Sequence, residues 1–146
     1  MLCKDVMMSL VFECKKDVPV EQCAQVMRDE HIGFIPITGA DGNLVGVVTD
    51  RDLVLRVMAA QKPLSTPVGD IMSSGPLLTC APDEDLRDLE KRMSQERRSR
   101  AVVMEKDKVV GVISLSDIAQ AERSSSRAGK LLRDVTHRES ALIARP

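Results

Sequence analysis

The octapeptide GVVTDRDL at residues 46–53 returns as GVISLSDI at residues 111–118, an offset of 65 residues. The tripeptide DVM at residues 5–7 returns as DIM at residues 70–72 with the same offset. Self-similarity at a fixed spacing is the signature of a repeated structural unit. The sequence therefore predicts two diverged copies of one unit, and the two echoes bracket nearly the whole of each copy.

Each copy carries the same order of predicted elements. Apolar residues recur at helical spacing after Val20 and after Leu86, and the Asp-Gly dipeptide at residues 41–42 predicts a hairpin turn. In the first copy we expect a strand at 10–14, a helix from Val20, strands at 34–37 and 44–48, and a helix from Asp50. In the second copy we expect a strand at 77–80, a helix from Leu86, strands at 101–104 and 109–113, and a helix from 115 or 116. Sheets this small are not stable alone, so we expect the copies to pair.

The repeat sets the expected domain organisation. Residues 1–60 form the first repeat and residues 68–122 the second, joined by a linker at 61–67 that contains two prolines. Residues 123–146 form a C-terminal tail, in which Leu131, Leu132 and Val135 give a short amphipathic segment that packs back on the protein or contacts a partner.

Composition excludes several classes of protein. Of 146 residues, 43% are hydrophobic but only 1% aromatic, so the chain lacks the aromatic platforms on which RNA binders stack bases. The 21 basic and 22 acidic residues give a net charge of -1, which argues against nucleic acid as a partner. Apolar runs fall short of the roughly 20 residues that span a bilayer, and the first residues lack the apolar region of a signal peptide. We expect a cytoplasmic protein with no membrane partner.

The four cysteines, Cys3, Cys14, Cys23 and Cys80, are scattered without a CxxC pair or a neighbouring histidine. This spacing argues against a zinc site and against a disulfide scaffold. We expect reduced thiols in structural positions and no bound metal.

The repeated layout, ending each time in a glycine, an apolar pair and then T/S-x-x-D, resembles the cystathionine beta-synthase (CBS) domain family, in particular stand-alone bacterial proteins made of one tandem CBS pair. The likeness covers about residues 1–122. It implies an α/β (α+β) fold of two pseudo-twofold-related β-α-β-β-α repeats, with a cleft between the sheets. It also implies a homodimer, no required cofactor, and binding of AMP, ADP, ATP or a related adenosyl compound.

The T/S-x-x-D motif suits a nucleotide for distinct chemical reasons. Thr49 and Ser114 can donate hydrogen bonds to a phosphate at the start of a helix, whereas an ionised Asp52 or Asp117 can accept both ribose hydroxyls. The resemblance assigns them these roles. The same spacing is also that of a helix capping box, and both interpretations stay open. Asp50 is expected to be the cap of its helix.

The resemblance places adenine against residues 33–36, namely Gly33, Phe34, Ile35 and Pro36, with Val11 across the cleft. Core packing explains Phe34 and Ile35 equally well. In the second copy the corresponding proline is absent and three arginines surround the stretch, of which Arg100 could hold a phosphate or simply be solvated. Arg51 could reach a phosphate or a carboxylate of another chain. The missing proline and the arginines of the second copy leave open whether one or both sites are occupied.

The expected function is that of a regulatory module, which binds an adenine nucleotide and signals to an unidentified protein. An enzyme would need a nucleophile or general base with an orienting neighbour, and no such set can be assembled from this sequence. The alternative is a structural dimerisation module with no nucleotide ligand, in which the repeated motifs serve only as helix caps.

Overall fold

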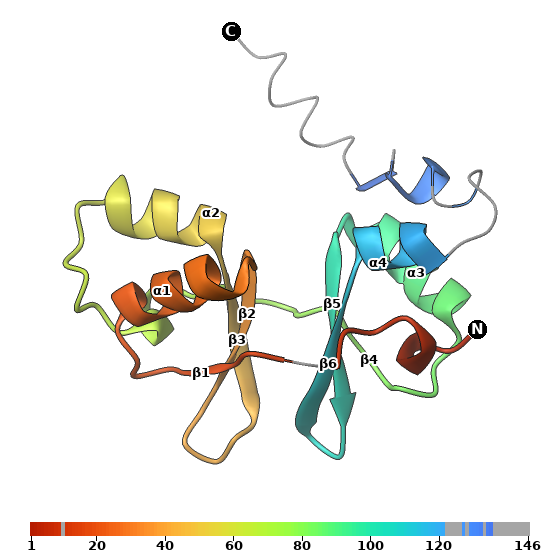
Figure 1. Cartoon of the computed structure of the whole chain (residues 1–146), viewed down its shortest axis with the longest axis horizontal. Coiled ribbons are helices and arrows are strands. Elements are labelled where there is room, and N and C mark those ends of the chain that lie inside the picture. Colours follow the sequence, from red (N-terminus) through yellow and green to blue (C-terminus); the bar gives the residue numbers. More distant parts are fainter. Residues whose placement is uncertain (10, 122–126, 128, 133, 136–146) are drawn as a thin grey trace, which may run out of the picture. The chain divides into compact units, whose positions relative to one another are not determined.

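The computed structural model describes residues 1–9, 11–121, 127, 129–132, 134 and 135 (Figure 1). The chain divides into two compact units. The first-copy unit comprises Val11–Leu77 with Lys106–Val109, and the second-copy unit comprises Met1–Leu10, Leu78–Glu105 and Val110–Pro146. No helix among the described residues is long and apolar enough to cross a membrane.

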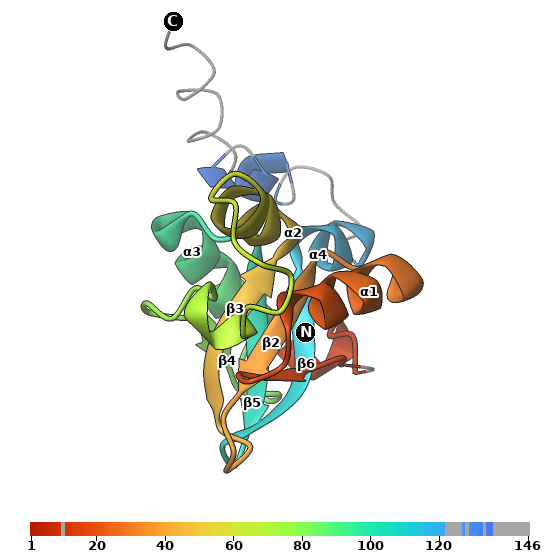
Figure 2. The same cartoon turned by 90° about the vertical axis from the view of Figure 1, so that its left-hand side faces the viewer.

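The first-copy unit is a three-stranded sheet with helices on one face (Figure 1). Its elements are β1 (Cys14–Lys15), α1 (Val20–Glu30), β2 (Phe34–Thr38), β3 (Leu44–Thr49), α2 (Asp50–Leu53), the π-helical η2 (Val54–Met58) and the 3-10 helix η3 (Val68–Asp70). β1 runs parallel to β2, and β2 pairs antiparallel with β3. In Figure 2 the turn of the β2–β3 hairpin lies at the end of the sheet opposite α2.

The second-copy unit repeats this design. Its elements are the 3-10 helix η1 (Cys3–Asp5), β4 (Thr79–Cys80), α3 (Leu86–Glu96), β5 (Arg100–Glu105), β6 (Lys108–Ser114) and α4 (Leu115–Ala121). The sheet order is β4-β5-β6, with β4 parallel to β5. The prediction of two α/β repeats is therefore confirmed.

Element boundaries follow local chemistry closely. Both long helices end on a residue in the left-handed conformation, His31 after α1 and Arg97 after α3. The hairpin turns use left-handed residues as well, with φ of 81° at Gly42 and 48° and 63° at Lys106 and Asp107. Lys106 and Asp107 thus form a two-residue turn of the kind that matches the twist of the flanking strands.

The first strand of each copy is shorter than its apolar sequence predicts. In β1 only Cys14 and Lys15 pair with β2, and in β4 only Thr79 and Cys80 pair with β5. The prediction of strand at 11–13 and 77–78 is wrong, because pairing with a neighbour, and not apolar composition, fixes the length of a strand. Residue 10 lies outside the described residues.

A methionine side chain packs on each of the two repeat glycines. A Cβ atom at Gly46 would lie 2.5 Å from Met72 Sδ and 2.9 Å from the carbonyl oxygen of Ser73. A Cβ atom at Gly111 would lie 2.7 Å from Met7 Sδ. The motif therefore begins with glycine because a neighbouring segment approaches the strand too closely for a side chain.

These methionines show that the two copies exchange their leading segments. Backbone bridges join Met8 to Val112 and Val47 to Ser73, so the start of each copy is paired with a strand of the other. The exchange explains why DVM and DIM recur at the same offset as the glycines. Each tripeptide supplies the methionine that covers the glycine in the unit to which it is paired.

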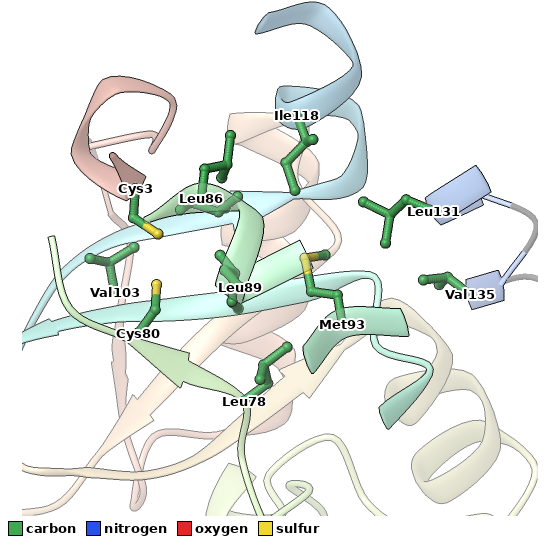
Figure 3. Close-up of a cluster of buried hydrophobic side chains, with 12 residues drawn as sticks. Cys3, Leu78, Cys80, Leu86, Leu89, Met93, Val103, Ile118, Leu131 and Val135 are labelled. Atoms are coloured by element: carbon green, nitrogen blue, oxygen red, sulfur yellow. The ribbon is translucent and has the colours of Figure 1, made fainter. Parts of the chain in front are cut away.

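Each unit has its own hydrophobic core. In the first-copy unit the buried cluster consists of Cys14, Val20, Cys23, Met27, Ile35, Ile37, Val48, Val57, Val68 and Ile71. In the second-copy unit it consists of Cys3, Leu78, Cys80, Leu86, Leu89, Met93, Ala101, Val103, Ile113, Ile118, Leu131 and Val135 (Figure 3). Aliphatic and sulfur-containing side chains make up both clusters, as the near absence of aromatic residues predicts.

Candidate functional site

The T/S-x-x-D motif of the first-copy unit forms a complete capping box. Thr49 Oγ1 accepts a hydrogen bond from Asp52 N at 3.1 Å, and Asp52 Oδ2 accepts one from Thr49 N at 3.0 Å. The cap of α2 is thus Thr49, whose backbone is extended, and the expectation that Asp50 is the cap is wrong. Asp50 is the first residue inside the helix, where its carboxylate accepts from Arg51 N at 2.9 Å.

The motif of the second-copy unit forms the same reciprocal pair. Ser114 Oγ accepts from Asp117 N at 3.2 Å, and Asp117 Oδ2 accepts from Ser114 N at 2.7 Å. Ser114 Oγ also donates to Asp117 Oδ2 at 2.6 Å and lies 2.7 Å from Ser116 Oγ. The capping interpretation is therefore confirmed in both copies.

Capping occupies only part of each carboxylate. Both boxes use Oδ2 of the aspartate, and a carboxylate has a second oxygen with two further lone pairs. The capping box and a ribose contact through Oδ1 are thus chemically compatible, and the box would fix the orientation of the carboxylate.

Asp52 also joins α2 to the segment at residues 71–73. It is 9% exposed, its Oδ2 lies 3.5 Å from Ser73 Oγ, and its Oδ1 lies 3.8 Å from Arg56 Nε. Arg56 in turn donates to the carbonyl oxygen of Ile71 at 2.9 Å. Asp52 is thus held by groups of its own unit on both sides of the carboxylate.

The residues expected at the adenine wall lie on and around β2. Ile35 is fully buried in the core cluster of the first-copy unit, which is the packing role. Phe34 and Pro36 alternate with it and therefore point to the other face of the sheet, where Phe34 pairs with Thr49. Val11 lies half-buried in the irregular segment before β1.

Gly33 lies directly beneath the carboxylate of Asp50. Its carbonyl oxygen accepts from Asp50 N at 3.1 Å, and a Cβ atom at Gly33 would stand 2.7 Å from Asp50 Oδ2. Arg51, the following residue, is exposed on α2. The start of α2 therefore carries an acidic side chain packed against Gly33.

A cavity of about 410 Å³ lies at the second motif, entirely within the second-copy unit. It is lined by Ser99, Arg100, Ser114, Leu115, Ser116, Ala119, Gly129 and Leu132. Two of these, Arg100 and Ser114, are predicted site residues. Asp117 adjoins the cavity through its hydrogen bonds to Ser114.

The sequence offered partial signals for the other lining residues. Ser116 is a second hydroxyl inside the repeated motif, and Ser99 corresponds to Gly33, since its carbonyl oxygen accepts from Leu115 N at 2.9 Å. Gly129 and Leu132 lie beyond the repeat, and nothing in their sequence points to a ligand site.

The lining favours an anion. Arg100 and three serines are part of the lining, and none of the lining residues that the structure describes is acidic. The equivalent place in the first-copy unit has Asp50 where the second has Leu115. A carboxylate repels a phosphate and a guanidinium attracts one, so this difference between the two motifs bears on which of them could hold an anion.

The cysteines occur as two contacting thiol pairs, one in each unit. Figure 3 shows the sulfur atoms of Cys3 and Cys80 directed toward each other, and burial raises the pKa of both thiols. A hydrogen bond with Cys23 lowers the pKa of Cys14. All four are free and buried, in agreement with structural thiols. Among the residues that the structure describes, no group of three or more His, Cys, Asp or Glu side chains could hold a metal ion.

Comparison with known proteins gives a consistent result. The model of the CBS domain family matches residues 3–59 and again residues 68–124. The CBS domain-containing protein YhcV of Bacillus subtilis is 31% identical over 134 residues, which cover 92% of this chain and 94% of YhcV.

Two solved structures show the same fold. The crystal structure of Hypoxic Response Protein I with two coordinated zinc ions has a TM-score of 0.74 at 26% identity, covering 84% of this chain and 99% of that one. The CBS domain pair of protein MJ0100, in complex with 5'-methylthioadenosine and S-adenosyl-L-methionine, has a TM-score of 0.72 at 23% identity, covering 82% and 94%.

Proposed function

This chain belongs to the CBS domain family as a tandem CBS pair, and from that premise we propose that it is a regulatory module that binds AMP, ADP or ATP in the cavity of the second-copy unit and signals to a protein partner. The observation that carries the proposal is the described lining of that cavity, where Arg100 and Ser99 lie with Ser114, which is hydrogen-bonded to the Asp117 carboxylate.

The chemistry of the lining matches the parts of a nucleotide. The Arg100 guanidinium can form paired, charge-assisted hydrogen bonds to a phosphate, and the Ser99 hydroxyl can donate to one of the remaining phosphate oxygens. Asp117 Oδ1 is suited to accept the ribose hydroxyls, while Leu115 and Ala119 offer apolar surface to the base. A volume of about 410 Å³ lies in the range of about 300–1,000 Å³ typical of small-molecule sites.

The comparison with MJ0100 supports the ligand class. That CBS pair is bound to two adenosyl compounds, and it shares the fold of this chain. We further propose that the first motif, with Asp50 over Gly33, does not hold a phosphate, so that the two motifs are unequally occupied. Thr49, Asp52, Phe34 and Pro36 remain candidates for an uncharged adenosyl group there.

The proposed role is one of binding and not of catalysis. Serine, arginine and apolar side chains line the cavity, and the lining residues that the structure describes include no His, Cys, Asp or Glu to act as a general base. A regulatory role requires the ligand to prefer one conformation of the protein, and the partner to sense the difference.

A calorimetric titration tests the proposal. We expect the wild-type protein to bind at least one of AMP, ADP and ATP, and Arg100→Ala to weaken that affinity by about tenfold or more, since a hydrogen bond to a charged group contributes about 1.5–3 kcal/mol. Arg98→Ala, an exposed arginine that does not line the cavity, is the matched control. Absence of heat with all three nucleotides, S-adenosylmethionine and 5'-methylthioadenosine would contradict the proposal.

The second candidate function, structural dimerisation, is favoured by one surface of the first-copy unit. Val54 and Leu55 are each 50% exposed on η2 and Met58 is 71% exposed, which is unusual for three large apolar side chains on one helical segment. We propose that a second copy of the chain covers this face. Light scattering should give a homodimer for the wild type and a monomer for Met58→Lys. A dimer that binds no adenosyl compound would leave dimerisation as the better account.

A further inference from the structure

The described part of the C-terminal tail is anchored in the second-copy unit. Leu131 is 3% exposed and Val135 is 8% exposed, and both belong to the core cluster, toward which Figure 3 shows them pointing. Arg127 Nε lies 3.0 Å from Glu90 Oε2 on α3, and the Glu90 side chain is 8% exposed. The match to the family model ends at residue 124, so this anchor belongs to a segment outside the family domain.

The anchored segment also forms a wall of the cavity. Gly129 and Leu132 alternate with the buried anchors and line the cavity together with Arg100, Ser114 and Leu115. Leu132 is 50% exposed, so a large part of its apolar surface is available for contact.

We infer that the tail is part of the ligand site and that Leu132 is an apolar contact for the bound nucleotide; this inference rests on the proposed function. Nucleotide binding and tail docking then stabilise each other. Arg100 and the serines take the charged part of the ligand, and Leu132 adds apolar surface to that of Leu115. Coupling between two binding events is reciprocal by thermodynamic necessity. A bound nucleotide thus stabilises the docked tail, and undocking of the tail lowers the affinity for the nucleotide.

The coupling gives the module a way to report on its ligand. The buried Glu90 carboxylate and the Arg127 guanidinium form an ion pair that stabilises the docked tail, so neutralising Glu90 weakens the docking. A partner that binds the tail in its undocked state therefore competes with the nucleotide, although the two need not touch each other.

The test combines calorimetry with limited trypsin digestion of the full chain, using AMP and ATP as probes. Leu132→Ser should raise the dissociation constant about fivefold, as expected for losing part of the contact of one leucine. Leu64→Ser, which changes a leucine that is 56% exposed in the first-copy unit, is the matched control and should leave it unchanged. Glu90→Gln should weaken binding and speed cleavage after the exposed Lys130.

Saturating nucleotide should slow cleavage after Lys130 relative to cleavage after the exposed Lys106, which serves as an internal reference. If the wild type binds nucleotide but Leu132→Ser matches it within twofold and cleavage after Lys130 does not change, the tail inference is wrong and the proposed function stands. If the wild type binds no nucleotide, both are wrong.

Discussion

Replacing Asp52 with alanine measures how much the first capping box contributes to folding. The substitution removes the acceptor of Thr49 N, the contact to Ser73 Oγ and the approach of Arg56 to the carboxylate. The side chain is 12% exposed, so water replaces these contacts poorly. We therefore expect a loss well above that of an ordinary surface substitution.

The magnitude follows from the separate contacts. A charge-assisted hydrogen bond to a partly buried backbone N–H contributes about 1.5–3 kcal/mol. The Arg56 pair adds little, at most about 0.5 kcal/mol, because the Nε–Oδ1 distance is 3.8 Å and the arginine side chain is 48% exposed. We expect Asp52→Ala to lower the free energy of unfolding by about 2 kcal/mol, which corresponds to a decrease of about 6 °C in Tm for a chain of this size.

Urea unfolding followed by far-ultraviolet circular dichroism is the suitable assay, because the chain has no Trp or Tyr to report by fluorescence. Asp50→Ala is the control, since that exposed carboxylate accepts only from the neighbouring Arg51 N, and its loss should stay within about 0.5 kcal/mol. Nucleotide affinity should not change in Asp52→Ala, because the proposed cavity lies in the other unit. A loss below about 0.5 kcal/mol would refute the reasoning, because the box would then contribute no more than a surface contact.

Further predictions concern backbone contacts and buried polar groups. Gly46→Ala should lower the free energy of unfolding by about 2 kcal/mol, whereas Gly111→Ala should cost about 1 kcal/mol, because a new Cβ meets the backbone oxygen of Ser73 in the first case and only the flexible Met7 side chain in the second. Equal losses in urea unfolding would contradict this difference. Thr38→Val should raise the free energy of unfolding by about 1 kcal/mol, since Thr38 Oγ1 is buried with no hydrogen-bond partner among the described residues. A destabilised Thr38→Val would show that this hydroxyl has a partner in solution.

The repeat predicted the architecture well because each copy constrains the other. Apolar residues at helical spacing placed the helices at Val20 and Leu86 correctly, and apolar runs around turn residues placed both hairpins. Helix starts and hairpins depend on local periodicity and turn chemistry, which a sequence displays directly. Strand length at β1 and β4 was not predictable in this way, because it depends on which residues of another strand are near enough to pair.

The exchange of leading segments was equally hidden. Residues 5–7 lie at the start of the first copy in sequence, yet Met7 covers Gly111 in the second-copy unit. Sequence distance gives no information on such a contact, although the equal offset of methionine and glycine is its consequence. The tail wall of the cavity was hidden for the same reason, since Gly129 and Leu132 reach it only because Leu131 and Val135 are anchored in a core formed by other elements.

The difference between the two motifs follows from a backbone that is the same in both. Asp50 N donates to the Gly33 carbonyl oxygen, and Leu115 N donates to that of Ser99, so the strand end and helix start are joined by an equivalent bond in each unit. This bond involves no side chain, and the capping box orients the aspartate independently of it. The residue after the capping hydroxyl can therefore change from an acid to leucine without loss of the local fold. The two motifs therefore differ in charge at this residue while the backbone around them stays equivalent.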